Sequence, residues 1–126
     1  MSYDLEIRSD DKYSEKADIE PLRAFVMKLP GIRLSGGQCC CYEDPQLQLY
    51  MEIDLEVVDE KGDRLDFILP EVNLLDKNSV NCIRLHVPYA HMHSDYRDQQ
   101  YIDVGLKLAH QLHWHLYDCQ LNTYLD

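Results

Sequence analysis

Histidines gather near the C-terminal end of this chain, in a pattern that could do chemistry. The segment reads LAHQLHWHLYDC, and two of its imidazoles are separated by a single residue. On a strand, two such imidazoles point to the same side and can share one metal ion. A third ligand would have to come from a distant residue, because neither His-Glu-x-x-His nor Cys-x-x-Cys is present. The histidines in question are His110, His113 and His115, and His91 and His93 form a second His-x-His pair.

The histidines could instead serve general acid–base catalysis. That chemistry needs an imidazole and a carboxylate within hydrogen-bond reach of each other, beside a pocket. His86 and His115 are the candidates, since both fall on polar positions of expected strands. The sequence contains none of the short motifs of serine hydrolases, P-loop proteins or dinucleotide-binding proteins. A His-based metal-binding protein or a small enzyme using an open-face histidine is therefore the alternative function, and no cofactor is expected.

Three consecutive cysteines form the other cluster of chemically versatile side chains. On a strand, Cys39 and Cys41 would share one face and Cys40 would lie on the other. The chain has five cysteines, an odd number that does not suit a disulfide framework. A reactive thiol needs a lowered pKa, and no lysine or histidine adjoins these positions. We therefore interpret the cysteines as reduced, small apolar residues that fill a strand.

The composition favours a cytoplasmic protein with a basic partner. A chain of 126 residues suits a single α+β domain over 1–126. Its formal net charge of −11 repels nucleic-acid phosphates and anionic membranes, and it attracts cationic proteins. No secretory signal and no membrane-spanning apolar run is visible. We expect no nucleic-acid or membrane partner.

The segment 47–57 carries the strongest periodic signal of the chain. Apolar and polar residues alternate with a spacing of two, which predicts a long strand with one buried and one solvated face. The polar positions carry a row of carboxylates beside an aromatic ring, an arrangement that suits lysine and arginine side chains. The row is also compatible with a merely solvated face. Its members are Tyr50, Glu52, Asp54 and Glu56.

The remaining periodic segments complete a two-layer arrangement. Short turns between neighbouring strands favour antiparallel pairing, and helices well separated in the chain can cover one face of the sheet. We therefore predict an α+β two-layer sandwich, with a mainly antiparallel sheet of five to six strands and two helices on one face. The expected strands are 3–8, 38–42, 47–57, 64–69, 80–87 and 114–117, the expected helices run from Asp18 to 29 and from Ser94 or Asp95 to Leu112, and 33–38 is expected to be a loop.

These elements decide where the histidines point. If the second helix ends at Leu112, Trp114 and Leu116 turn to the core, and His113 and His115 turn to the opposite, solvated face. Gly105, inside that helix, costs about 1 kcal/mol relative to alanine and suggests a close approach to the sheet. The predicted partner-binding face consists of Tyr50, Glu52, Asp54, Glu56, Arg84, His86, His113 and His115.

Both ends of the chain resemble a group of small bacterial proteins. The chain begins with Tyr3-Asp4-Leu5 and ends with Trp114-His115-Leu116-Tyr117-Asp118-Cys119-Gln120, closing on Tyr124-Leu125. The group begins with a Tyr-Asp-Leu strand and ends with a Trp-x-x-Tyr-Asp-Pro-Gln-like segment, whose proline is replaced here by Cys119. Some members resemble immunity partners of bacterial toxins, which are small, acidic and non-catalytic.

The function that these observations favour is non-catalytic binding. We expect an acidic protein of immunity or adaptor type that binds a basic protein partner. The same open sheet face is also a plausible surface for a homodimer.

Overall fold

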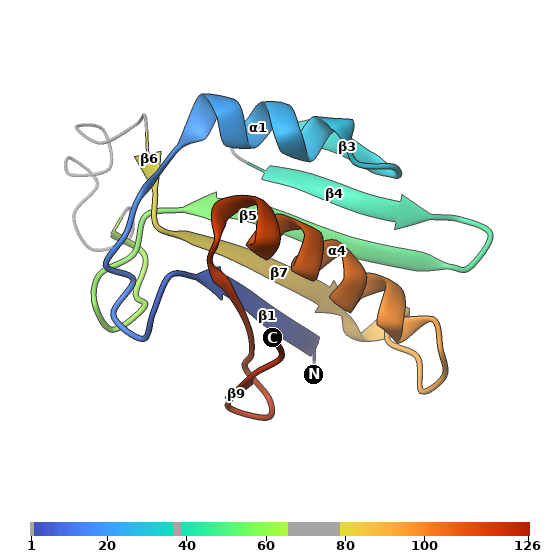
Figure 1. Cartoon of the computed structure of the whole chain (residues 1–126). Helices are drawn as coiled ribbons and strands as arrows, with labels where there is room; N and C mark the ends of the chain where they lie inside the picture. Colours follow the sequence, from blue (N-terminus) through green and yellow to red (C-terminus); the bar gives the residue numbers. More distant parts are fainter. Residues whose placement is uncertain (1, 37–38, 66–78) are drawn as a thin grey trace.

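The computed structural model describes residues 2–36, 39–65 and 79–126, which form an α+β fold (Figure 1). Its strands are β1 (Ser2–Arg8), β2 (Ala17–Asp18), β3 (Ile32–Gly36), β4 (Cys39–Asp44), β5 (Leu49–Glu56), β6 (Ser79–Val80), β7 (Cys82–Pro88), β8 (His115–Asp118) and β9 (Thr123–Tyr124). Its helices are α1 (Ile19–Lys28), the short 3₁₀ helix η1 (Tyr89–His91) and α4 (Asp98–Leu112).

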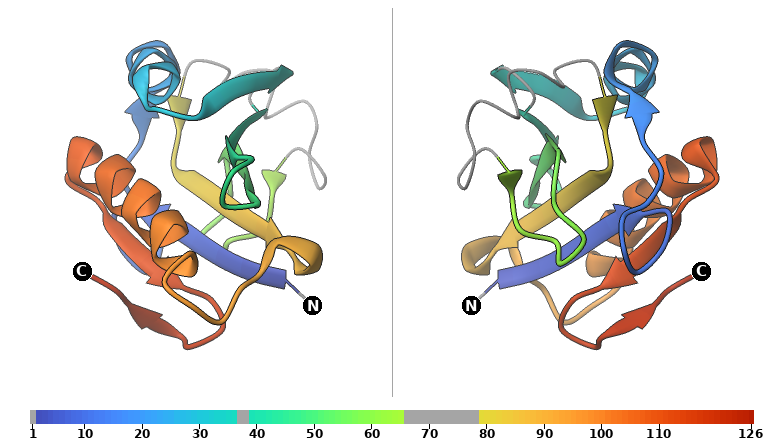
Figure 2. Two further views of the ribbon diagram at one scale, coloured as in Figure 1. Left: turned by 90° about the vertical axis from the view of Figure 1, so that its right-hand side faces the viewer. Right: turned by 90° about the vertical axis from the view of Figure 1, so that its left-hand side faces the viewer.

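In the part of the chain that the structure describes, seven strands form one antiparallel sheet in the order β3-β4-β5-β7-β1-β8-β9. Helices α1 and α4 lie on the same side of this sheet (Figure 1), and the turned views show the sheet curving around them (Figure 2). The short strands β2 and β6 form a separate pair. The predicted two-layer α+β sandwich with helices on one face is confirmed. Among the described residues, no helix combines the length and apolar character that a membrane crossing requires.

The alternation seen in 47–57 builds the centre of the core. Met51 and Ile53 of β5 are fully buried, as are Ile83 and Val87 of β7. Their side chains meet the apolar face of the helices, represented by Val26 of α1. Because consecutive strand residues point to opposite sides, the polar residues of the same strands lie on the other face of the sheet. We call this face, away from the helices, the outer face.

Helix α4 approaches the sheet closely at Gly105. A Cβ atom at this position would lie 2.9 Å from Cδ1 of Leu116 and 3.1 Å from Cδ1 of Leu85. Both leucines are buried, so they have little room to move. The close approach predicted from this glycine is confirmed.

The sheet gains strands at its two edges that the sequence analysis missed. Strand β3 (Ile32–Gly36) includes residues 33–36 of the expected 33–38 loop, and residues 37–38 lie outside the described residues. Beyond 114–117, the last expected strand, the chain forms β9, which pairs with β8. Within the described residues, both strands have a partner on one side only. The pairing of β3 with β4 shifts register between Leu34 and Gly36, so that Ser35 has no partner residue in β4.

The hairpin after β5 follows the prediction only in part. A turn follows the strand, in which the Asp59 N–H donates to the Asp63 carbonyl oxygen at 2.9 Å. In the described part of the expected strand 64–69, an isolated bridge joins Val58 and Arg64. Residues 66–69 lie outside the described residues.

Candidate functional site: a pocket on the outer face of the sheet

Strand register gathers charged side chains from three strands into one pocket on the outer face. Residues paired across neighbouring strands project to the same side. One row across β5, β7 and β1 is Glu52, His86 and Asp4, and the next is Asp54, Arg84 and Glu6. Together with Glu56, Arg64 and Cys119, these side chains line a pocket of about 260 Å³, which we call the acidic pocket.

Glu52 and Asp54 are the least neutralised carboxylates of the acidic pocket. Both residues are half-buried. Glu52 forms no hydrogen bond or ion pair with any described residue. Asp54 lies beside the Cys39 thiol, which is a neutral group, and raises the pKa of that thiol. The negative charges of Glu52 and Asp54 therefore remain available to a cation that arrives from solvent.

His86 is paired with a carboxylate at the rim of the same pocket. Its Nδ1 lies 2.7 Å from Oδ1 of Asp4, and the two side chains are 42% and 39% exposed. The other Asp4 oxygen, Oδ2, accepts a hydrogen bond of 2.6 Å from the Ser2 hydroxyl. The contact between His86 and Asp4 is the one that general acid–base catalysis would require. The neighbouring thiol of Cys119 is not an activated nucleophile, because burial raises its pKa to about 12.

Glu56 does not lie on a solvated face, contrary to the prediction. It is only 4% exposed. Arg84 approaches one of its oxygens at 2.6 Å, and Arg64 approaches the other at 3.5 Å. Arg84 also donates to the carbonyl oxygen of Gly62, so the turn after β5 covers this end of the strand. Burial raises the pKa of Glu56, and the two guanidiniums lower it.

A buried polar network closes the adjoining part of the outer face. The Tyr13 hydroxyl donates to Oε1 of Glu6 at 2.6 Å. The Arg8 guanidinium donates to the Tyr13 hydroxyl at 3.0 Å and lies 3.9 Å from the centroid of the Tyr117 ring. Sequence reasoning missed this network. The polar positions of the first strand were the available signal, but their partners come from segments distant in the chain.

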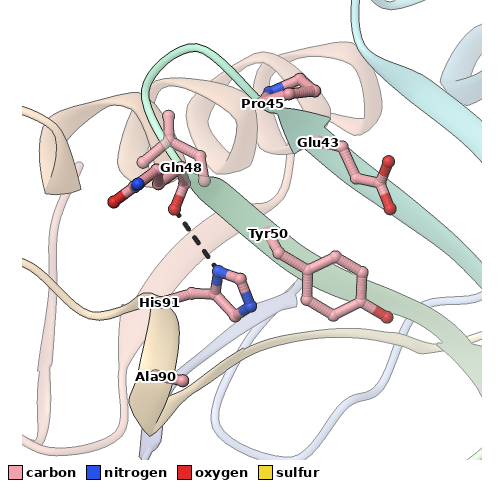
Figure 3. Close-up of a pocket in the computed structure, with 7 residues that line it drawn as sticks. Glu43, Pro45, Gln48, Tyr50, Ala90 and His91 are labelled. Carbon is pink, nitrogen blue, oxygen red and sulfur yellow. Dashed lines mark hydrogen bonds between the residues drawn. The ribbon is translucent and has the colours of Figure 1, made fainter.

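Tyr50 lies in a second pocket at the other end of β5. This pocket, which we call the tyrosine pocket, has a volume of about 510 Å³. Figure 3 shows the His91 imidazole beside the Tyr50 ring, and their centroids are 5.4 Å apart. His91 was considered in the sequence only as a metal ligand, so its position beside Tyr50 was not anticipated. The pocket is lined by Glu43, Pro45, Gln48, Leu49, Tyr50, Ala90 and His91.

The structure separates the histidines that are close in the sequence. His113 does not lie on a strand as predicted, but ends α4 in the left-handed conformation, with φ of 57°. Trp114 and Leu116 are buried as predicted, and His115 begins β8 with an exposed side chain. His115 is 3.8 Å from a carboxylate oxygen of Asp126, in a hollow separate from the acidic pocket.

The histidine and cysteine clusters show no metal centre. Among the described residues, no three His, Cys, Asp or Glu side chains are placed to hold a metal ion. The ring nitrogens of His91 and His93 both approach the carbonyl oxygen of Gln48, at 3.4 and 3.2 Å. Cys40 lies in the core, and Cys41 is buried as well. The pKa of Cys39 is raised to about 11, mainly by the neighbouring carboxylate of Asp54.

Comparison of the chain with protein-family models, curated proteins and solved structures gives no match. The class that the structure itself defines is an α+β protein with helices on one face of an antiparallel sheet. Its functional assignment therefore depends on the two pockets of the outer face.

Proposed function

We propose that this chain is a non-catalytic cytoplasmic protein that binds a basic segment of a partner protein through its acidic pocket. The supporting observation is the charge balance of that pocket, which is lined by five carboxylates and two guanidiniums. Arg84 and Arg64 are both engaged by buried Glu56, which leaves the charges of Glu52 and Asp54 for an incoming cation. A protein of immunity or adaptor type would use such a surface.

The size and exposure of the acidic pocket suit one side chain better than a small metabolite. Its volume of about 260 Å³ is just below the range of about 300–1,000 Å³ that is usual for small-molecule sites. A lysine or arginine side chain entering between half-buried carboxylates gains more Coulomb energy than one on a fully solvated surface. Because solvent still reaches the pocket, the attraction is expected to weaken with added salt.

A charge-reversal experiment tests this function. The probe is an acetylated tetra-arginine peptide, with tetra-glutamate as the negative control, titrated by calorimetry in 20 and 300 mM NaCl. Glu52→Lys is expected to weaken tetra-arginine binding about tenfold or more at low salt. The matched control is Asp103→Lys on α4, which changes the net charge equally on the helical side of the sheet. Absence of binding, or an equal loss in both variants, would overturn the proposal.

A second use of the outer face is self-association. Light scattering of the protein at increasing concentration distinguishes a homodimer from a monomer. If Glu52→Lys alters the mass of the protein alone, the face pairs two copies of this chain rather than binding a basic partner.

The contact between His86 and Asp4 supports one alternative function, a small enzyme that uses this histidine as general base. A panel of chromogenic ester, phosphate and glycoside substrates provides the test. Turnover that disappears in His86→Gln but persists in His115→Gln would favour catalysis. Under the binding proposal, we expect no turnover above that of buffer.

A further inference from the structure

The tyrosine pocket is held in shape by hydrogen bonds that join distant segments. The buried hydroxyl of Tyr101 donates to the His91 carbonyl oxygen at 2.7 Å and accepts the Tyr50 backbone N–H at 3.1 Å. The Gln48 backbone has φ of 59°, and its carbonyl oxygen is approached by the imidazoles of His91 and His93. A site that is ordered before binding loses less conformational entropy when a ligand arrives.

The surfaces that line this pocket suit a cation with several donors. The Tyr50 ring offers an aromatic face, and the Gln48 carbonyl and Glu43 carboxylate offer acceptor oxygens. Arg33 lies nearby and pairs with Glu43 at 2.8 Å, so Glu43 supplies an acceptor rather than an unneutralised charge. Burial and the carboxylate of Glu52 raise the pKa of Tyr50 above its ordinary value of 10.0. A guanidinium stacks on such a ring better than an ammonium does.

Each pocket contributes one residue to the same face of β5, and these two residues are spaced by the repeat of an extended chain. Tyr50 and Glu52 are two residues apart on the same face of β5, which corresponds to about 6.6–6.8 Å along a strand. An extended peptide lying along the outer face has the same two-residue repeat, so its side chains at i and i+2 reach both pockets. Side chains at i and i+1 would point to opposite sides.

We infer that the tyrosine pocket is a second subsite for the basic partner and that it accepts an arginine side chain. The partner segment would then be extended and carry Arg-x-Arg or Arg-x-Lys, with the second basic residue in the acidic pocket. This inference rests on the proposed function, because it names the spacing of the basic residues that the same face would recognise. The negative charge of the acidic pocket, the aromatic ring and acceptor oxygens of the tyrosine pocket, and the spacing of Tyr50 and Glu52 together identify the occupant.

Two peptides of identical composition test the spacing. Acetylated and amidated Gly-Arg-Ser-Arg-Gly and Gly-Arg-Arg-Ser-Gly are titrated into the whole protein at 20 mM NaCl and followed by NMR chemical shifts. The spaced peptide is expected to bind about tenfold more tightly. Tyr50→Leu is expected to remove this preference, and Tyr50→Phe, which keeps the ring, is expected to retain it. The NMR spectrum of each free variant shows whether it is folded, and Tyr50→Phe is the informative variant if Tyr50→Leu unfolds.

The outcomes distinguish the inference from the function on which it rests. Equal affinity for the two peptides, with both weakened by Glu52→Lys, would overturn the second subsite and leave the acidic pocket supported. A preference for the spaced peptide that survives in folded Tyr50→Leu would also overturn it, as would loss of the preference in Tyr50→Phe. Failure of both peptides and of tetra-arginine to bind would overturn the inference and the proposed function together.

Discussion

The Nε atom of Arg84 lies 2.6 Å from Oε1 of Glu56, and this ion pair divides the outer face of the sheet. On one side of this pair, a buried hydrogen-bond network joins Glu6, Arg8 and Tyr13. On the other side, Glu52 and Asp54 remain accessible from solvent. The pair therefore has a structural role that should be measurable apart from any binding activity.

Replacing Arg84 by alanine is expected to destabilise the fold in a pH-dependent way. Removing one partner of a buried pair costs several kcal/mol, and we expect about 2–3 kcal/mol at pH 7 because Arg64 still contacts Glu56. Urea unfolding at pH 4.5 and pH 7 gives the free energy of unfolding. Arg97→Ala, which removes an ion pair with Asp95 on the surface, is the control and should change the stability little.

The sign of this pH dependence follows from the raised pKa of Glu56. Burial raises it above the ordinary value of 4.5, and loss of Arg84 would raise it further. The native state then binds more protons than the unfolded state above pH 4.5, so stability falls as the pH rises through the folded-state pKa. The penalty of Arg84→Ala should therefore be smaller at pH 4.5 than at pH 7. An equal penalty at both values would contradict the assigned role of Glu56.

Gly105→Ala is expected to destabilise the protein, although alanine is the better helix former. The added Cβ would lie 2.9 Å from Cδ1 of buried Leu116. Overpacking of a core lowers the free energy of unfolding by about 1–3 kcal/mol. The better helix propensity of alanine offsets about 1 kcal/mol of this loss. A net loss of about 1 kcal/mol is expected in thermal unfolding, and it should shrink in a Leu116→Val background. Stabilisation by Gly105→Ala would show that α4 can move away from the sheet.

Cys39 is expected to react slowly despite its exposure. Although the residue is exposed, its pKa is raised from 9.0 to about 11, mainly by the neighbouring carboxylate of Asp54 and further by partial desolvation of the sulfur. The thiolate fraction at pH 8 is then about a hundredfold lower than for a thiol with the ordinary value. Alkylation with iodoacetamide, followed by tandem mass spectrometry, measures the rate at this position. Asp54→Ala should accelerate the reaction. Equal rates before and after the substitution would exclude Asp54 as the cause.

His113→Gly is expected to stabilise the protein by about 0.5–1 kcal/mol. His113 has φ of 57° at the end of α4, a conformation that glycine adopts without the cost imposed by a side chain. His115→Gly is the control and should destabilise the protein, because glycine weakens a strand. Thermal unfolding measures both variants. If His113→Gly is instead destabilising, the histidine side chain makes an interaction that the helix-capping role does not include.

The sequence by itself determined the secondary elements whose side chains repeat regularly. The alternation in 47–57 identified the central strand and its inward aliphatic residues, and Trp114 and Leu116 were correctly assigned to the core. Gly105 correctly indicated the close contact between helix and sheet. These features depend on residues within one element, so their periodicity is readable along the chain.

Only the tertiary structure decided which polar residues form a site. Strand order and register placed Asp4 beside His86, although 82 positions separate them in the chain. The turn at Gly62 covered Glu56, whose position in the alternation is the same as that of Glu52. Periodicity assigns a side chain to a face, but the exposure and charge of that side chain depend on partners from other strands and turns.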